Sequence, residues 1–156
     1  APVVSAVVSS KRGRNAAGWY STSVTVRFTC AEGSAPLAND CPAPVSLRNA
    51  DGTLERTITS SDGSSASGSV TVRVTVDTTK PTLRTRLAGD APYAASARPV
   101  RCSATDALSG VAGDCSVSYG AVRTRANGSR FRTWTASVRD VAGNRTTRTG
   151  SFGVRR

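Results

Sequence analysis

An internal repeat constrains the fold of this chain more than any other feature of its sequence. The segment Gly18-Trp19-Tyr20 aligns with Pro92-Tyr93-Ala94 at an offset of 74 residues, and the match continues without a gap through Asp40-Cys41 over Asp114-Cys115. Beyond this segment, two small insertions widen the offset to 78 residues. Because the repeat fills the 156 residues twice, the sequence predicts a duplication into two similar domains.

The local pattern within each repeat is that of β-strands. Val24, Val26 and Phe28 alternate with polar residues, as do the valines of segment 70–76. Strict alternation buries one face of a strand and leaves the other in water, which is typical of antiparallel sheets. The sequence therefore predicts an all-β chain of two tandem antiparallel β-sandwiches. Four segments carry turn signals: Ala50-Asp51-Gly52, Ser61-Asp62-Gly63, Ala126-Asn127-Gly128 and Ala142-Gly143-Asn144.

The chain has four cysteines, and the repeat selects their pairing. It predicts the disulfides Cys30–Cys41 and Cys102–Cys115, one in each domain. Closing a loop of this length stabilises a domain by about 2–3 kcal/mol in the chain-entropy model. Disulfides indicate an oxidising compartment, so we expect a secreted or cell-surface protein. The chain has no His and no close Cys pairs, which argues against a zinc site.

Turn and linker motifs in the sequence resemble those of bacterial immunoglobulin-like repeats, which occur in arrays on secreted and surface proteins, especially of actinobacteria. The resemblance implies immunoglobulin-like domains at 1–79 and 80–156, and a role as spacer, stalk or adhesive module. The first repeat departs from the pattern at 32–36 and 62–65. The matching segments are Gly18-Trp19-Tyr20, Thr105-Asp106-Ala107-Leu108-Ser109-Gly110-Val111, Asp140-Val141-Ala142-Gly143-Asn144 and the linker Asp77-Thr78-Thr79-Lys80-Pro81-Thr82.

Positive charge is concentrated in the second half of the chain. Of the net charge of +11, residues 1–79 contribute +1 (seven Lys and Arg against six Asp and Glu), and residues 80–156 contribute +10 (fourteen against four). Such an asymmetry favours an anionic partner for the second domain. The competing interpretation is that these arginines only keep the strands soluble.

A basic hairpin at 121–132 gives the most specific binding hypothesis. Asn127-Gly128 between alternating strands predicts a two-residue type I′ turn. That register places Arg125 opposite Arg130 and Arg123 opposite Arg132, so that four guanidinium groups share one face. We expect wall teichoic acid, an acidic glycan or, less favoured because stacking aromatics are scarce, nucleic acid. Three more arginines would extend this surface: Arg139, Arg145 and Arg148.

One difficulty concerns the face of the strand on which Trp134 lies. Trp134 resembles a core residue, yet it is two and four positions away from Arg132 and Arg130, which places all three on the same face of a regular strand. Either a bulge switches the faces or the hairpin tip projects beyond the sandwich. Trp19, Tyr93 and Trp134 are expected in the core or at domain ends. The alternative for the whole hairpin is a solvated strand pair with screened charges.

Catalysis is not expected from this sequence. Without His, the chain lacks the usual activation of a Ser or Cys nucleophile. Most carboxylates lie beside turn residues, where they cap turns. We therefore predict no catalytic residue and no cofactor, with one open alternative. Calcium would be held if four loop residues met at one end of the sandwich: Asp106, Asp114, Asp140 and Asn144.

Two functional hypotheses follow. The first is a non-catalytic extracellular module that serves as spacer, adhesive or assembly unit of a surface protein or filament. Its partners would be other domains or subunits, which pair through sheet edges and the extended segment 2–8. The second is a polyanion-binding module that acts through the basic second domain, as an accessory domain of a secreted hydrolase. No apolar run is long enough for a membrane span.

Overall fold

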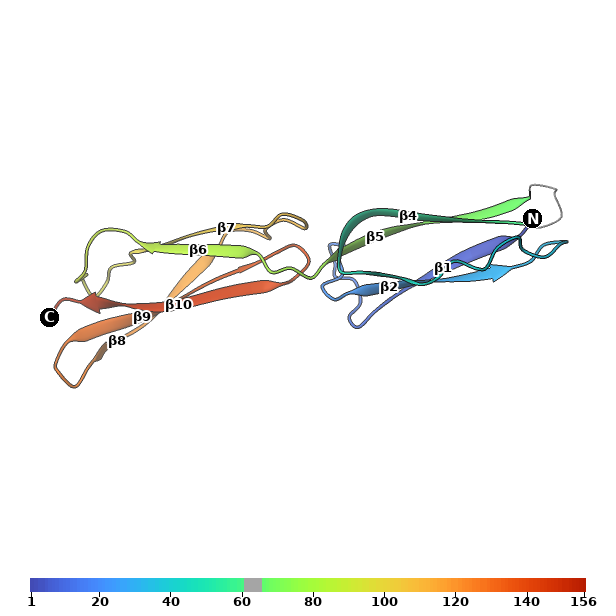
Figure 1. The fold of residues 1–156 in the computed structure, drawn as a ribbon. Helices are drawn as coiled ribbons and strands as arrows, with labels where there is room; N and C mark the ends of the chain where they lie inside the picture. Colours follow the sequence, from blue (N-terminus) through green and yellow to red (C-terminus); the bar gives the residue numbers. More distant parts are fainter. Residues whose placement is uncertain (61–65) are drawn as a thin grey trace. The chain divides into compact units, whose positions relative to one another are not determined.

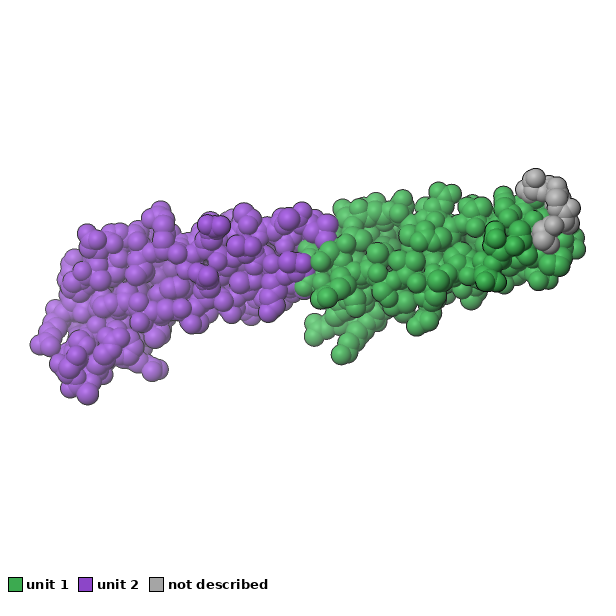
Figure 2. Space-filling model, viewed as in Figure 1, with its two compact units in different colours: residues 1–78 green, residues 79–156 purple. Residues whose placement is uncertain are grey.

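The computed structural model of the chain describes residues 1–60 and 66–156. These residues fold into ten β-strands, and they contain no helix, so the predicted all-β class is confirmed. The strands divide into two compact units, Ala1–Thr78 and Thr79–Arg156 (Figure 2). The boundary lies one residue from the predicted one. No helix that could cross a membrane is present in the part of the chain that the structure describes.

Unit 1 contains a three-stranded and a two-stranded antiparallel sheet (Figure 1). The first has the order β1-β2-β3, and the second consists of β4 and β5. Alternation produces its core, because Val24, Val26 and Phe28 on β2 face Ile58 and Val74 from the other sheet. The strands are β1 (Val3–Ser10), β2 (Val24–Ala31), β3 (Val45–Leu47), β4 (Asn49–Thr59) and β5 (Ser67–Asp77).

The turn predicted at Ala50-Asp51-Gly52 is wrong. These residues lie within β4, where Asp51 pairs with Thr75 and Gly52 with Val74 of β5. Pairing over eleven residues satisfies the backbone groups that a turn would leave open. The Asp51 carboxylate forms an ion pair with Arg73 across the strands, at 2.6 Å. The turn signal at Ser61-Asp62-Gly63 lies outside the described residues.

Unit 2 contains five strands, as many as the described residues of unit 1 form, and they are arranged in a related way. Its three-stranded sheet has the order β10-β9-β8, and β6 pairs with β7. The turns predicted at Ala126-Asn127-Gly128 and Ala142-Gly143-Asn144 join these strands, as expected. The strands are β6 (Thr82–Leu87), β7 (Val100–Thr105), β8 (Ser116–Thr124), β9 (Arg130–Arg139) and β10 (Arg145–Val154).

The core of unit 2 is more aromatic than that of unit 1. Phe152 receives edge-to-face contacts from Tyr93 and Tyr119, with ring centroids 5.3 and 6.1 Å away. Such contacts stabilise a core beyond the area that they bury. Trp134 packs against both buried clusters of the unit, one around Phe152 and one around Val138. Tyr93 and Trp134 are thus core residues, as predicted.

The duplication is visible in the backbone of both units. In unit 1 the N–H of Tyr20 donates to Thr75, and in unit 2 the N–H of Tyr93 donates to Gly153 by the same parallel bridge to the last strand. Tyr93 is therefore the equivalent of Tyr20, one residue away from the alignment by sequence. The two units differ in one strand, since β3 pairs with β2 whereas its counterpart β8 pairs with β9.

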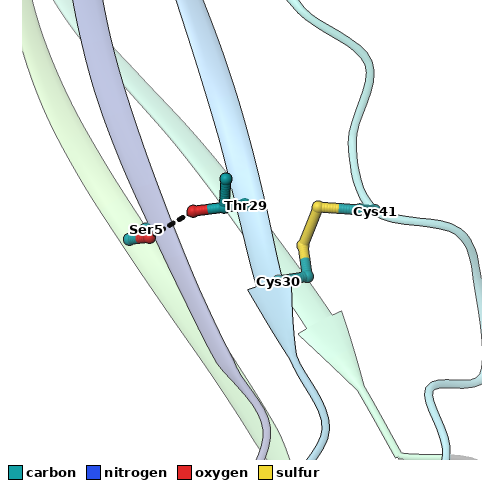
Figure 3. Close-up of a disulfide and its surroundings, with 4 residues drawn as sticks. All are labelled: Ser5, Thr29, Cys30 and Cys41. Carbon is teal, nitrogen blue, oxygen red and sulfur yellow. Dashed lines mark hydrogen bonds between the residues drawn. A yellow bond between two sulfur atoms is a disulfide. The ribbon is translucent and has the colours of Figure 1, made fainter.

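Both predicted disulfides are present. Cys30 on β2 bonds Cys41 in the following loop, with a Cα–Cα distance of 5.7 Å (Figure 3). Cys102 on β7 bonds Cys115, with a Cα–Cα distance of 6.2 Å. Each bridge holds the second strand of a unit to the loop that follows it. No free cysteine remains among the described residues, which include all four.

A glycine opposite Trp134 generates a stability prediction. Gly150 of β10 pairs with Trp134, and a Cβ at Gly150 would lie 2.5 Å from Cζ2 of the indole. We expect Gly150→Ala to destabilise unit 2 by about 1–3 kcal/mol, because the indole must leave its place in the core. Urea denaturation followed by fluorescence of Trp134 in a Trp19→Phe background measures this change.

Gly153→Ala is the matched control for this prediction. Gly153 lies on the same strand, and a Cβ there would meet no atom within 4 Å. We expect its effect to stay within about 0.5 kcal/mol. Equal losses for the two variants would show that the packing of Trp134 on Gly150 does not matter for stability.

Candidate anion-binding surface

The hairpin between β8 and β9 has a longer loop than predicted. The N–H of Gly128 donates to the carbonyl of Arg125 at 2.9 Å, and the N–H of Arg125 donates to Ser129 at 2.8 Å. Gly128 has a φ of 84°, and Asn127 Oδ1 accepts hydrogen bonds from the N–H and hydroxyl of Ser129. This is a three-residue loop, a type I turn followed by a left-handed glycine, and not the predicted two-residue type I′ turn.

The extra loop residue shifts the strand register by one. Thr124 pairs with Arg130, Arg123 with Phe131, and Val122 with Arg132. Since side chains alternate with a period of two, a shift of one residue moves Arg123 to the face opposite Arg132. The predicted array of four guanidinium groups on one face is therefore wrong.

Several hairpin arginines are engaged within the unit. Arg132 donates from Nε to the carbonyl of Gly120 at 2.6 Å and from Nη1 to Ala95 at 2.8 Å. Arg125 lies over the ring of Phe131, 4.1 Å from its centroid, and Arg130 donates to the carbonyl of Arg155. These contacts hold guanidinium groups against the protein, which lowers their availability to a ligand.

The structure also resolves the difficulty around Trp134. The register of β8 shifts between Tyr119 and Val122, whereas β9 pairs with β10 without a bulge. Arg132 therefore lies on the same face of β9 as Trp134. The Arg132 guanidinium covers the ring of Tyr119, 5.4 Å from its centroid. An arginine thus closes the end of the core, because its long side chain reaches carbonyl groups there.

The other three predicted arginines do not join the hairpin. Arg139 and Arg145 face each other across β9 and β10, and both line a shallow cleft of about 290 Å³ together with Asp114. This pair lies at the opposite end of β9 from Arg130, about 30 Å away at the usual rise of a strand. Arg148 lies opposite Ala136 and is exposed. The seven residues do not form one surface.

The residues considered for calcium form turns. Asp106 Oδ1 accepts from the N–H groups of Leu108 and Gly110, at 3.1 and 2.9 Å. Asp140 is buried, and its two oxygens accept from the backbone and side-chain nitrogens of Asn144, each at 2.8 Å. Carboxylate oxygens of Asp106 and Asp140 lie within 4.8 Å of each other. Asp114 is not in this group, since it lines the cleft beside Arg139.

A different set of arginines lies together on the outward face of β6 and β7. Arg86 is directly opposite Arg101, and Arg84 is directly opposite Ser103. All four are exposed, whereas Leu83 on the same strand is buried in the core. They line a groove of about 470 Å³, completed by Thr85 and Cys102. We refer to Arg84, Arg86, Arg101 and Ser103 as the β6–β7 groove.

Sequence reasoning missed this groove, although a signal was present. Arg84 and Arg86 alternate with Leu83 and Leu87, which already places both arginines on one face. What the sequence did not show was the pairing of β6 with β7, which adds Arg101 to the same face. The Asn-Gly turn favoured the hairpin instead, because such a turn predicts which residues of the two strands are paired.

Unit 1 carries a different set of side chains on the equivalent strand pair. Ser5 lies opposite Thr29 and Val7 opposite Arg27, in the register that β6 and β7 repeat. The hydroxyls of Ser5 and Thr29 share a hydrogen bond of 2.6 Å (Figure 3). One scaffold therefore presents three arginines in unit 2 and one in unit 1.

The cations of unit 2 lack carboxylate partners. The structure describes every residue of this unit, and none of its Lys or Arg side chains forms an ion pair; the one ion pair among the described residues, Arg73–Asp51, belongs to unit 1. Two of the four acidic residues of unit 2, Asp106 and Asp140, already accept hydrogen bonds in turns. The positive charge of unit 2 is therefore not neutralised by neighbouring carboxylates.

Unit 1 has a cleft of another character. Trp19 is half-buried and lines a space of about 460 Å³ with Arg14, Asp51 and Arg73. No aromatic residue lines the β6–β7 groove. The two surfaces thus differ in the chemistry that they present.

No family model, no curated protein and no solved structure matches this chain.

The direct pairing of two arginines generates a second stability prediction. Like charges directly opposite each other destabilise a strand pair, so Arg86→Val should stabilise unit 2 by about 0.2–1 kcal/mol at low salt. Val is the residue at the equivalent position of unit 1, Val7. Urea denaturation at 10 mM and 1 M NaCl, in a Trp19→Phe background, measures the change and its screening.

Val7→Arg is the reciprocal variant. It creates the same like-charge pair with Arg27 in unit 1, and we expect a loss of similar size there. Amide hydrogen exchange of β1 and β2 reports this loss separately from unit 2. A gain for Arg86→Val that persists unchanged in 1 M NaCl would contradict the electrostatic explanation.

Proposed function

We propose that this chain is a non-catalytic module of an extracellular protein, built from two tandem immunoglobulin-like sandwiches, and that its second unit binds an anionic polymer. The observation that carries the proposal is the unpaired charge of unit 2. Fourteen Lys and Arg stand against four Asp there, and none of these cations forms an ion pair. The electrostatic field of such an excess of positive charge raises the local concentration of anionic ligands and the rate at which they associate.

The arrangement of strands in unit 2 supports the immunoglobulin-like part of the proposal. One sheet contains the last two strands and a middle strand, in the order β10-β9-β8, and the first two strands form the other sheet. Immunoglobulin sandwiches divide their strands in a similar way, with G, F and C on one sheet and A and B on the other. Disulfides in both units support an extracellular location.

The available side chains support a binding role and not catalysis. The sequence has no His, and all four cysteines are paired in disulfides. Asp106 and Asp140 accept hydrogen bonds from their own turns. A surface of exposed arginines holds an anion by charge-assisted hydrogen bonds, which need no reactive group.

Binding to defined polymers tests this function. Chain 1–156 is titrated with poly(glycerol phosphate), dextran sulfate and polyglutamate at 50 and 150 mM NaCl in a calorimeter. We expect at least one polymer to bind at 150 mM NaCl, with an affinity that falls as salt rises because counterions are released. Absence of binding to all three polymers at 50 mM NaCl would overturn the proposal.

Two variants assign the binding to a unit. Replacing Lys11, Arg12 and Arg14, three exposed cations of unit 1, by Ser should leave the affinity within about twofold, because long-range charge alone contributes little near 0.15 M salt. A second variant removes six cations of unit 2 and should abolish binding. Losses in proportion to the number of cations removed, three against six, would mean that net charge, and not unit 2, governs binding. The six are Arg84, Arg86, Arg101, Arg139, Arg145 and Arg148.

A second candidate function is self-assembly through β1. This strand lies at the edge of its sheet, and Val3 and Val7 on its outward face are 59% and 61% exposed. Exposed apolar edge strands favour pairing with another chain. A second copy of this chain would pair with β1 and cover these valines.

Light scattering over a range of protein concentrations tests this candidate. We expect a concentration-dependent dimer whose dissociation constant rises about tenfold in Val3→Thr/Val7→Lys, because the change removes apolar area and adds charge to the edge. The control is Leu87→Thr, which changes an exposed apolar residue of unit 2. A monomer at millimolar concentration excludes assembly through this edge.

A further inference from the structure

The four residues of the β6–β7 groove lie on one face of the strand pair and line one space. Residues directly opposite on an antiparallel pair have Cβ atoms about 5 Å apart, and residues two apart on one strand are separated by about 6.7 Å. Arg86 and Arg101 form the first kind of pair, and Arg84 and Arg86 the second. The three arginine side chains therefore leave the same face of the strand pair close together, and each is long enough to contact one ligand above the strands.

We infer that the β6–β7 groove binds a tetrahedral oxyanion, the phosphate or sulfate group of an extracellular polymer. This inference rests on the proposed function and assigns that function to Arg84, Arg86, Arg101 and Ser103. Guanidinium groups bind such oxyanions by paired, charge-assisted hydrogen bonds. Arg101 Nη1 donates one hydrogen bond to the carbonyl of Arg98 at 2.8 Å, and its guanidinium group has four further N–H donors for a ligand.

The donor set favours a tetrahedral anion over a carboxylate. The groove presents three guanidinium groups and the hydroxyl of Ser103. A carboxylate has two oxygens in one plane, whereas phosphate and sulfate groups accept hydrogen bonds from several directions. Nucleic acid fits less well, because stacking on aromatic side chains contributes much of single-strand binding and no aromatic residue lines the groove.

Unit 1 shows that the scaffold does not require these arginines. The same strand register accepts Ser5 and Val7 at the positions of Arg84 and Arg86. In unit 2, Arg86 and Arg101 repel each other, and no carboxylate is paired with either. An anion bound between Arg86 and Arg101 would replace this repulsion by two attractive contacts. Binding of an anion therefore explains why two arginines stand opposite each other where folding does not need them.

Two triple variants of unit 2 with equal net charge test the assignment in the full chain. The groove variant, R84S/R86V/R101S, takes its β6 substitutions from the equivalent positions of unit 1, and the comparison variant is R139S/R145S/R148S. We expect the groove variant to lower the affinity for poly(glycerol phosphate) or dextran sulfate at least about tenfold more than the comparison variant, since each lost charged hydrogen bond corresponds to about tenfold. Equal effects of the two triples would overturn the inference.

A gain-of-function variant extends the test to unit 1. Ser5→Arg/Val7→Arg next to Arg27 reproduces the three arginines of the groove, with Thr29 in the place of Ser103. We expect the number of polymer sites per chain to rise from one to two. Hydrogen exchange of β1 and β2 verifies that the variant is folded, and a folded variant with one site counts against the inference.

The choice of polymer separates the remaining outcomes. Preference for poly(glycerol phosphate) or for dextran sulfate identifies the source of the oxyanion, while equal binding of polyglutamate would overturn the tetrahedral chemistry. Tighter binding of oligothymidylate than of either polymer would assign the groove to nucleic acid and also overturn the inference. If the wild-type chain binds no polymer, the proposed function itself is contradicted. If the wild-type chain binds but both triple variants lose affinity equally, only the assignment of binding to the β6–β7 groove is contradicted.

Discussion

Antiparallel pairing of neighbouring strands decides which side chains of this chain form the core and which meet solvent. Side chains alternate along each strand, so the register of a pair fixes the composition of both faces at once. In unit 2 the pairing of β6 with β7 buries Leu83 and Val100 and brings Arg84, Arg86 and Arg101 together on the outside. The core and the candidate site are therefore two consequences of one ladder of hydrogen bonds, and a slip of one residue would exchange them.

Most of the fold was predictable because it depends on patterns with period two. The alternating valines of β2 and β5 predicted buried faces, and the duplication predicted both disulfides. The hairpin at Asn127-Gly128 was predicted with the wrong register, since two- and three-residue loops accept the same Asn-Gly sequence and differ only in backbone conformation. The turn predicted at Asp51-Gly52 is wrong for a different reason. Pairing with β5 overrides the local turn preference of these two residues.

The candidate site was less predictable than the fold, because it depends on which strands become neighbours. β3 and β8 occupy equivalent positions in the repeat, yet β3 pairs with β2 and β8 with β9. No periodicity within a strand distinguishes these two choices. Arg132 is a second example of what the sequence cannot predict. It is a charged residue on the core face of β9, and the carbonyls of Gly120 and Ala95, which accept its hydrogen bonds, come from distant parts of the chain.

The duplication separates the demands of folding from those of binding. Both units keep the same register between their first two strands, with a buried Val4 in one and a buried Leu83 in the other. Their outward residues differ, and unit 1 joins Ser5 to Thr29 by a hydrogen bond where unit 2 places Arg84 beside Ser103. The shared register therefore does not require arginines at these positions, and the pair in unit 2 carries a cost in like-charge repulsion. Interaction with an anion would explain the arginines of β6 and β7, because it would remove the repulsion that the scaffold alone leaves in place.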